Sequence, residues 1–262
     1  HYRSHSFPTR RSSDLIGTIA GQATFDLAAT SSNVTKTSQA EASSDSSNGL
    51  IGGSSIDVAS DATLTGMTIG SLAADASSTD GFAKASAGAD DNAVGAVLPS
   101  LTVGGIGNIT GAAQLDSSAD ALSVSSSSQA FAGLGQTVTG LNASDIDVAS
   151  DASLTAQGFS NLDASATSTE KFARAQAGDG SSMVTGLASG LDLDIGGIGT
   201  LAATAQGTAD ATATTVDESA RAFASQQSVG IAPGLNMDTA SDAMVSSTST
   251  IVGGADAAST SG

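Results

Sequence analysis

The chain of 262 residues contains no cysteine and no tryptophan, and it has only three prolines. Without cysteine it can form no disulfide framework, no thiolate zinc site and no cysteine nucleophile. Positive charge is also scarce, because 8 Lys and Arg residues stand against 26 Asp and Glu residues. The resulting formal charge of −18 disfavours nucleic acid and anionic membranes as partners, since their phosphates bind Lys and Arg. No apolar run is long enough to cross a bilayer, so membrane insertion is not expected.

The first fifteen residues, HYRSHSFPTRRSSDL, differ in character from the rest of the chain. The run from His5 to Leu15 resembles the in-frame translation of a common sequencing adapter, so we interpret residues 1–15 as a non-native artefact. Both histidines and the only tyrosine lie in this segment. With no histidine left to activate its many serines, the native part is not expected to be an enzyme. Its 25 acidic residues outnumber five basic ones, which are Lys36, Lys84, Lys171, Arg174 and Arg221.

One stretch returns three times in the remaining sequence. SIDVASDATLT at Ser55–Thr65 recurs as DIDVASDASLT at Asp145–Thr155 and, less well kept, as NMDTASDAMV at Asn236–Val245. In the first copy Ile56 and Leu64 fall on one side of an extended chain, and the aspartates fall on the other. This period of two predicts a half-buried β-strand.

The repeat divides the chain into units. Isoleucines at the head of each unit, Ile16, Ile106 and Ile198, lie 90 and 92 residues apart. We therefore expect repeats at residues 16–105 and 106–197 and a partial repeat at 198–262, and we expect the chain to be a fragment of a longer array. A Phe-Ala signal, as at Phe82 and Phe172, splits each unit into two halves of similar length.

Each half-unit is expected to contain strand, turn, long strand, Gly-rich turn and strand. Glycines are expected at the corners, where they reach dihedral angles that are closed to other residues. These glycines are Gly66, Gly88, Gly104 and Gly105. Ser168–Gly178 also fits a short capped helix, but its counterpart Ser125–Gly133 does not, so a strand is favoured there.

The strands carry mainly small side chains, and a core of this kind gains little free energy per residue. Stability is therefore expected from the stacking of successive units. The predicted fold is all-β, an elongated repeat array built as a β-solenoid or as stacked β-sheets. Tandem β-sandwich domains, one per unit, are the alternative. Such domains are disfavoured because the native part has six Phe and no Trp or Tyr to fill their cores.

Recurring aspartates supply the only candidate metal ligands. Asp57 and Asp61 in the first copy, and Asp147 and Asp151 in the second, offer carboxylate oxygens of the kind that Ca²⁺ accepts. They match no EF-hand spacing, and a solvated acidic surface is the favoured interpretation. We expect no catalytic residue and no bound cofactor, and calcium is the one cofactor worth testing.

Residues 16–262 resemble the large β-strand-repeat proteins of bacterial surfaces and secreted matrices. The resemblance lies in the long repeat, the bias toward Ala, Ser, Thr, Gly and Asp, the acidity and the lack of cysteine. It implies an extracellular or cell-surface location and a role in adhesion, biofilm matrix or envelope structure. We therefore expect a structural, adhesin-like stalk whose partners are further copies, other surface proteins or glycans. A calcium-dependent or carbohydrate-binding β-repeat module is the alternative function.

Overall fold

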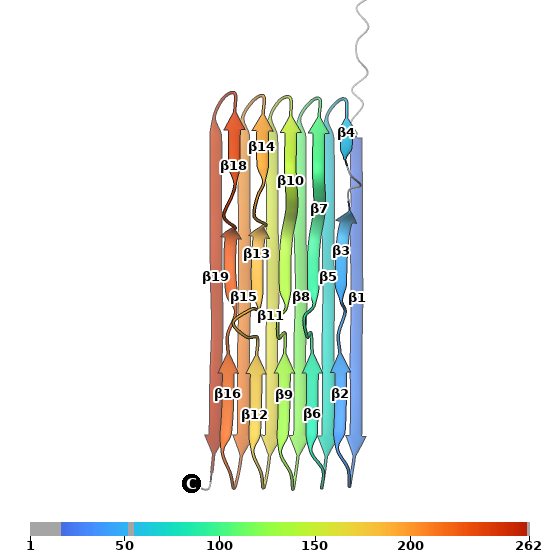
Figure 1. Cartoon of the computed structure of the whole chain (residues 1–262), viewed down its shortest axis with the longest axis vertical. Coiled ribbons are helices and arrows are strands. Elements are labelled where there is room, and N and C mark those ends of the chain that lie inside the picture. Colours follow the sequence, from blue (N-terminus) through green and yellow to red (C-terminus); the bar gives the residue numbers. More distant parts are fainter. Residues whose placement is uncertain (1–16, 52–54, 261–262) are drawn as a thin grey trace, which may run out of the picture.

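A computed structural model describes residues 17–51 and 55–260 of the chain. The adapter-like segment, residues 1–15, lies outside the described residues. Within the described ranges the chain forms nineteen β-strands and no helix. The strands wind into stacked coils, and in each coil one long strand is followed by a return path of shorter strands (Figure 1). The long strands begin at residues 17, 62, 107, 152, 199 and 243, so each coil takes 44 to 47 residues.

One layer of the molecule is a single parallel sheet, sheet A, made of the six long strands. Each strand has 17 residues, and neighbouring strands pair in register over their whole length, from Gly17 with Ala62 to Asn33 with Ser78 in the first pair. Every second residue of the interior strand β5 is buried, because successive residues of a strand point to opposite faces. In spatial order the strands are β1 (Gly17–Asn33), β5 (Ala62–Ser78), β8 (Gly107–Ser123), β11 (Ala152–Ser168), β15 (Gly199–Thr215) and β19 (Ala243–Ser259).

The opposite layer consists of two further parallel sheets that follow one another along the return path. Sheet B packs on the carboxyl-terminal halves of the long strands, and sheet C packs on their amino-terminal halves. Sheet B contains β2 (Ser38–Ala42), β6 (Ala83–Ala87), β9 (Ser128–Ala132), β12 (Ala173–Ala177) and β16 (Ala220–Ala224). Sheet C contains β3 (Ser46–Ile51), β4 (Ile56–Val58), β7 (Asn92–Val103), β10 (Thr137–Val148), β13 (Met183–Leu187), β14 (Asp192–Ile195), β17 (Gln227–Ile231) and β18 (Asn236–Thr239).

Two cores of different composition lie between the layers. Beneath sheet B nearly all buried side chains are alanines, such as Ala85 of β6 and Ala74 of β5. Beneath sheet C the core contains many Leu, Ile and Val side chains, such as Ile146 of β10 and Leu154 of β11. A buried alanine removes little apolar area from water, so the alanine-rich end gains its stability from the repetition of coils.

The predicted architecture, an elongated array built as a β-solenoid, as stacked sheets or as tandem sandwiches, is wrong as stated, although the described residues are all-β. Three parallel sheets without a helix among the described residues fit a parallel β-helix, whereas sandwiches of the predicted kind are antiparallel. The described stack is also not elongated along its coil axis. A strand of 17 residues spans about 56 Å, whereas six strands side by side span roughly 24–29 Å. The sequence pattern identified the alternation along each strand, but it did not contain the direction of strand pairing.

A column of glycines lies where the two layers come into backbone contact. Strand pairing aligns one glycine from each coil of sheet C, namely Gly49, Gly95, Gly140, Gly186 and Gly230. A Cβ on Gly140 would lie 2.6 Å from the carbonyl oxygen of Gln157 in β11, closer than real Cβ atoms approach. Because the obstructing atoms belong to backbone, a side chain at this column would push the layers apart.

Sheet A contributes glycines to the same contact. A Cβ on Gly66 in β5 would meet the carbonyl oxygen of Gly95, and one on Gly111 in β8 would meet that of Gly140. The prediction that Gly66 marks a corner is therefore wrong, because it lies inside a strand and serves the close approach of the two layers. Gly88, with a φ of 69°, does lie at a turn between strands.

We expect Gly140→Val to lower the free energy of unfolding by more than about 3 kcal/mol. Overpacking of a core costs about 1–3 kcal/mol, and here the obstructing backbone cannot rotate away. Urea unfolding followed by circular dichroism measures the change. Gly180→Ala is the matched control and should stay within about 1 kcal/mol of wild type, since nothing lies within 4 Å of its Cβ. A Gly140→Val protein as stable as the control would show that backbone contact does not hold the layers.

Candidate functional site

The positive charge of the described residues gathers on sheet B and in the turns that enter it. Lys84, Arg174 and Arg221 belong to strands of sheet B, and Lys36 and Lys171 lie in turns between sheets A and B. The strands of sheet B carry a single carboxylate, that of Glu41. Within the described ranges, sheet B is therefore the cationic surface of a strongly acidic chain.

Strand pairing arranges the outward side chains of sheet B in two columns that run across five coils. The first column contains Gln39, Lys84, Gln129, Arg174 and Arg221. The second column contains Glu41, Ser86, Phe131, Gln176 and Phe223. The alanines and serines between them point inward, so these ten side chains form the outward surface that we call the cationic face.

Cations and aromatic rings alternate diagonally across the cationic face. The Phe131 ring centroid lies 5.7 Å from Lys84 Nζ and 5.3 Å from Arg174 Cζ. Arg174 Cζ also lies 5.8 Å from the centroid of Phe223, and Arg221 Cζ lies 5.7 Å from that of Phe172. Each such contact contributes about 0.5–1 kcal/mol at an exposed site. The rings therefore hold the cations in place without neutralising them.

Among the described residues the cations of this face have no carboxylate partner. In the part of the chain that the structure describes, the ion pair present joins Lys171 and Glu218, 3.6 Å apart in the turns beside sheet B. Arg174 Nη2 donates to Gln176 Oε1 at 2.7 Å, and Arg174 Nε is buried without a hydrogen-bond partner. The charges of Lys84, Arg174 and Arg221 remain available to an anionic partner.

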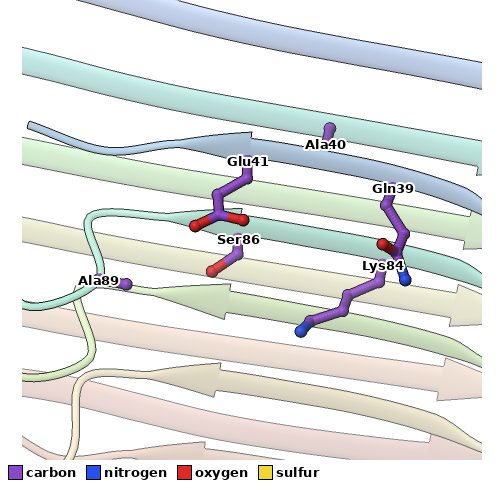
Figure 2. A pocket seen from close by; sticks show the side chains of 6 residues that line it. All are labelled: Gln39, Ala40, Glu41, Lys84, Ser86 and Ala89. Carbon is purple, nitrogen blue, oxygen red and sulfur yellow. The ribbon is translucent and has the colours of Figure 1, made fainter.

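A shallow hollow of about 470 Å³ lies at the first two coils of the cationic face (Figure 2). Glu41 and Lys84 project into it from the neighbouring strands β2 and β6, and Ala89 borders it from the loop after β6. Its remaining lining residues are Gln39, Ala40 and Ser86. The hollow thus offers a cation, a carboxylate, an amide and a hydroxyl, which are groups that bind a polar partner.

The four aspartates proposed as calcium ligands are not brought together. Asp57 and Asp147 point outward from sheet C in one column, but Thr102 of β7 separates them. That column continues through Asp194 and Asp238 on the later coils. In the described ranges no group of three or more His, Cys, Asp or Glu residues is placed to hold a metal ion.

Asp61 and Asp151 instead close the turn that leads from sheet C to the next long strand. Asp61 Oδ1 accepts a hydrogen bond from the backbone N–H of Ile106 at 2.7 Å. Asp151 Oδ1 accepts one from Ile198 at 2.8 Å, in the equivalent turn two coils later. The repeat of these aspartates in the sequence therefore reflects a repeated structural role, in which each carboxylate ties one coil to the next.

Sheet A carries a second charged surface that the sequence reasoning missed. Seven outward carboxylates, which we call the acidic band, lie in the carboxyl-terminal halves of its strands, and each of the six coils contributes at least one. They belong to Asp26, Asp75, Asp116, Asp120, Asp163, Asp210 and Asp256. The first eight residues of every long strand contain no charged side chain. Period-two alternation marks each aspartate as outward-facing, but alignment into a band requires the coil spacing.

Neighbouring carboxylates within the acidic band influence one another. Partial desolvation, and then the negative charges of Asp75 and Asp163, raise the pKa of the Asp120 carboxyl above its usual range. A like charge disfavours ionisation and an opposite charge favours it. The band is therefore a surface on which an added cation would be favourable.

A single carboxylate is buried at the junction between sheets B and C. Asp91, 1% exposed, accepts a hydrogen bond from the Ser44 backbone N–H at 2.7 Å through Oδ1, and its Oδ2 has no hydrogen-bond partner. Burial raises the pKa of Asp91 to about 6, with the Ser44 bond opposing the shift and the charges of Asp45 and Asp90 adding to it. On the next coil uncharged Gln136 fills the equivalent place.

The described part of the chain contains no helix long and apolar enough to span a bilayer. Its charged surfaces are instead arranged on the two outer faces of the coil stack. The cationic face and the acidic band lie on opposite layers at the same end of the molecule.

We expect Asp151→Ala to lower the free energy of unfolding by about 1–2 kcal/mol, because the Ile198 N–H loses its acceptor. Asp151→Asn should cost less than half as much, since the amide oxygen still accepts this bond. Both differences should be the same in calcium chloride and in a chelator when measured by urea unfolding. A wild-type protein stabilised by calcium, with neither variant responding, would make Asp151 a metal ligand instead.

We expect Asp91→Asn to stabilise the protein at pH 7, by at most about 3 kcal/mol for a shift of two pKa units. The folded-state pKa of about 6 lies above the unfolded value near 3.9, so the folded state favours the protonated form. Stability that is fully present below pH 4 is therefore lost as the pH rises through 6. Urea midpoints between pH 4 and 7 should fall in the wild type by more than in Asp91→Asn. The exposed Asp57→Asn serves as control, and a pH profile of Asp91→Asn that matches that of the control would contradict the assignment.

No protein-family model, no curated protein and no solved structure matches this chain. One fold can host many functions, so the function has to be argued from the residues themselves. Those residues supply a cationic face with aromatic rings on sheet B, an acidic band on sheet A, and aspartates that tie the turns together.

Proposed function

We propose that this protein is a non-enzymatic structural and interaction module of a bacterial cell surface or extracellular matrix, adhesin-like in its role. The observation that carries the proposal is the cationic face. Its side chains recur in two columns over five coils, and no described carboxylate forms an ion pair with its three strand cations. A surface that repeats with the coil suits binding to an extended partner, whereas a catalytic site needs one unrepeated constellation.

The scaffold is suited to holding this surface rigid. Each strand of sheet B pairs on both sides except at the ends of the sheet, and its inward alanines are buried against sheet A. The aromatic rings fix the cations before a partner arrives, so less side-chain entropy is lost on binding. Rigid presentation on strands, with the side chains held by their neighbours, is what a binding surface requires.

The chemistry of the described residues supports a role without catalysis. They include no histidine and no cysteine, so Ser86, the one serine of the cationic face, has no histidine beside it to act as a base. The extracellular or cell-surface location is part of the proposal and rests on the likeness of the composition and repeats to bacterial surface proteins.

The proposal predicts adhesion through the cationic face. Microspheres coated with the wild-type protein should be retained on bacterial cells and on immobilised polysaccharides. The variant Arg174→Ser/Arg221→Ser/Phe223→Ser should retain at least about tenfold fewer beads, since loss of two charged contacts and one ring removes a few kcal/mol. The beads bound per area are counted by microscopy.

The control variant Asp147→Ser/Asp194→Ser changes the outward face of sheet C and should bind within about twofold of wild type. Equal retention of wild-type and albumin-coated beads would contradict a role in adhesion. Release of reducing ends from any of the polysaccharides would contradict the non-enzymatic assignment.

A further inference from the structure

The cationic face and the acidic band lie back to back. Leu72, Ala74 and Ala76 of β5 share one core with the inward alanines of sheet B, so this end of the molecule is two sheets thick. The cations point outward on one side and the carboxylates of the band point outward on the other. Neither surface is neutralised by ion pairs that the described residues make.

The remaining outward surfaces show a matching division. Sheet C carries six outward aspartates near its end, Asp57, Asp145, Asp147, Asp192, Asp194 and Asp238. They lie over the amino-terminal half of sheet A, whose outward side chains are uncharged and mostly hydroxyl or amide groups, as in Thr63, Asn108 and Ser153. Both layers of the molecule are therefore divided at the same level. At one end the cations of sheet B lie back to back with the acidic band of sheet A, and at the other end the aspartates of sheet C lie back to back with the uncharged half of sheet A.

From this pattern we infer that the partner of the cationic face is the acidic band of a second copy of the chain, with copies stacked face to face. The inference rests on the proposed function and names one partner for the proposed surface. A second copy displaced along the thin direction, without rotation, lays its acidic band over the cations of the first. The same displacement lays the uncharged amino-terminal half of sheet A of the second copy over the aspartates of sheet C of the first.

The spacings of the two surfaces are commensurate. Charges on both faces are separated by whole numbers of coils, and strands in a sheet lie about 4.8 Å apart. Because every coil contributes at least one carboxylate to the acidic band, Lys84, Arg174 and Arg221 each meet an acidic coil in any aligned register. Opposite charges meet at Lys84, Arg174 and Arg221, which is the condition that electrostatic complementarity requires, and Glu41 is the one carboxylate of the cationic face that meets a like charge.

The available area is sufficient for a stable contact. A strand of 17 residues by five coil spacings gives roughly 1,300 Å² on each copy at full overlap. Specific interfaces bury about 800 Å² per partner, so partial overlap suffices. Two different surfaces meet in this contact, and a pair of copies keeps one surface of each kind free, so the contact does not close and the assembly grows as an open stack.

Sedimentation velocity of the full chain over a range of concentrations tests the inference. At 0.01 M ionic strength, where the Debye length is about 30 Å, the wild type should form species larger than a dimer. At 1 M, where that length is about 3 Å, it should return to monomer. The cation-face variant Arg174→Glu/Arg221→Glu and the band variant Asp120→Lys/Asp163→Lys should each associate at least about tenfold more weakly than wild type at low salt.

Sedimentation of a mixture of the cation-face variant and the band variant tests whether the two surfaces bind each other. The band variant keeps an unaltered cationic face and the cation-face variant keeps an unaltered acidic band, so in the mixture the two variants should pair with an affinity within about threefold of that of the wild-type contact. The control Asp145→Lys/Asp194→Lys changes the net charge by the same +4 as the band variant, but on sheet C. The control variant should still associate, whereas the band variant should not. If association depended on net charge alone, the control and the band variant would both associate more strongly than wild type, because both are less acidic.

Three results would overturn the inference. The first is that the wild type stays monomeric at low salt. The second is that Arg174→Glu/Arg221→Glu associates as strongly as wild type, and the third is that the mixture of the two variants stays monomeric. Alginate, a soluble polyuronate, is run beside each sample. If the wild type is monomeric and binds alginate through Arg174 and Arg221, the face serves an acidic polysaccharide. Self-stacking is then wrong, while the bead retention described above still supports an adhesive role.

Discussion

Backbone contact between the two layers along the glycine column is the constraint on which the rest of the structure depends. At Gly95 and Gly140 sheet C approaches sheet A so closely that no side chain fits between them. One glycine must therefore recur in every coil, and the coils keep a nearly constant length of 44 to 47 residues. The one coil of 47 residues accommodates its extra length in the turn before β13 and in the loop between β13 and β14, where Leu191 packs into the core.

The in-register stacking of coils has a direct consequence for the surface. Residues at equivalent places in successive coils stack in columns about 4.8 Å apart, so any bias in composition at one place becomes a line of like groups. Buried columns of alanine and leucine gain from this arrangement, because identical side chains pack against one another. Columns of charge repel, and the cationic face reduces this repulsion by placing Gln129 between Lys84 and Arg174. Arg174 and Arg221 are direct neighbours, and Arg174 contacts the rings of Phe131 and Phe223 diagonally.

The sequence predicted what a single strand contains, and it failed where separate coils meet. Alternation in Asp145–Thr155 predicted extended structure, and those residues lie in β10 and β11 and the bend between them. The strand favoured over a helix at Ser168–Gly178 is confirmed by β12. The position of Gly66 inside a strand could not be predicted, because the sequence does not distinguish a glycine in a turn from a glycine at a backbone contact. Asp61 and Asp151 were open to the same ambiguity, since a carboxylate that binds calcium and one that accepts an N–H from the next coil have the same spacing. The acidic band required the coil alignment, which only three-dimensional pairing provides.

The placement of charge across the thin end of the molecule is better explained by contacts between copies than by attraction within one copy. Stacked sheets lie about 10 Å apart, and outward side chains on both sides add to that distance. The cations and the acidic band are thus separated by more than the Debye length of about 8 Å at physiological salt, so their attraction within one chain is largely screened. Opposite charges brought within 4 Å at an interface interact by about 4 kcal/mol at an effective dielectric constant of 20, before desolvation is counted. The same charges therefore contribute little to folding and much to association, and this difference in magnitude favours the outward surfaces as the functional part of the structure.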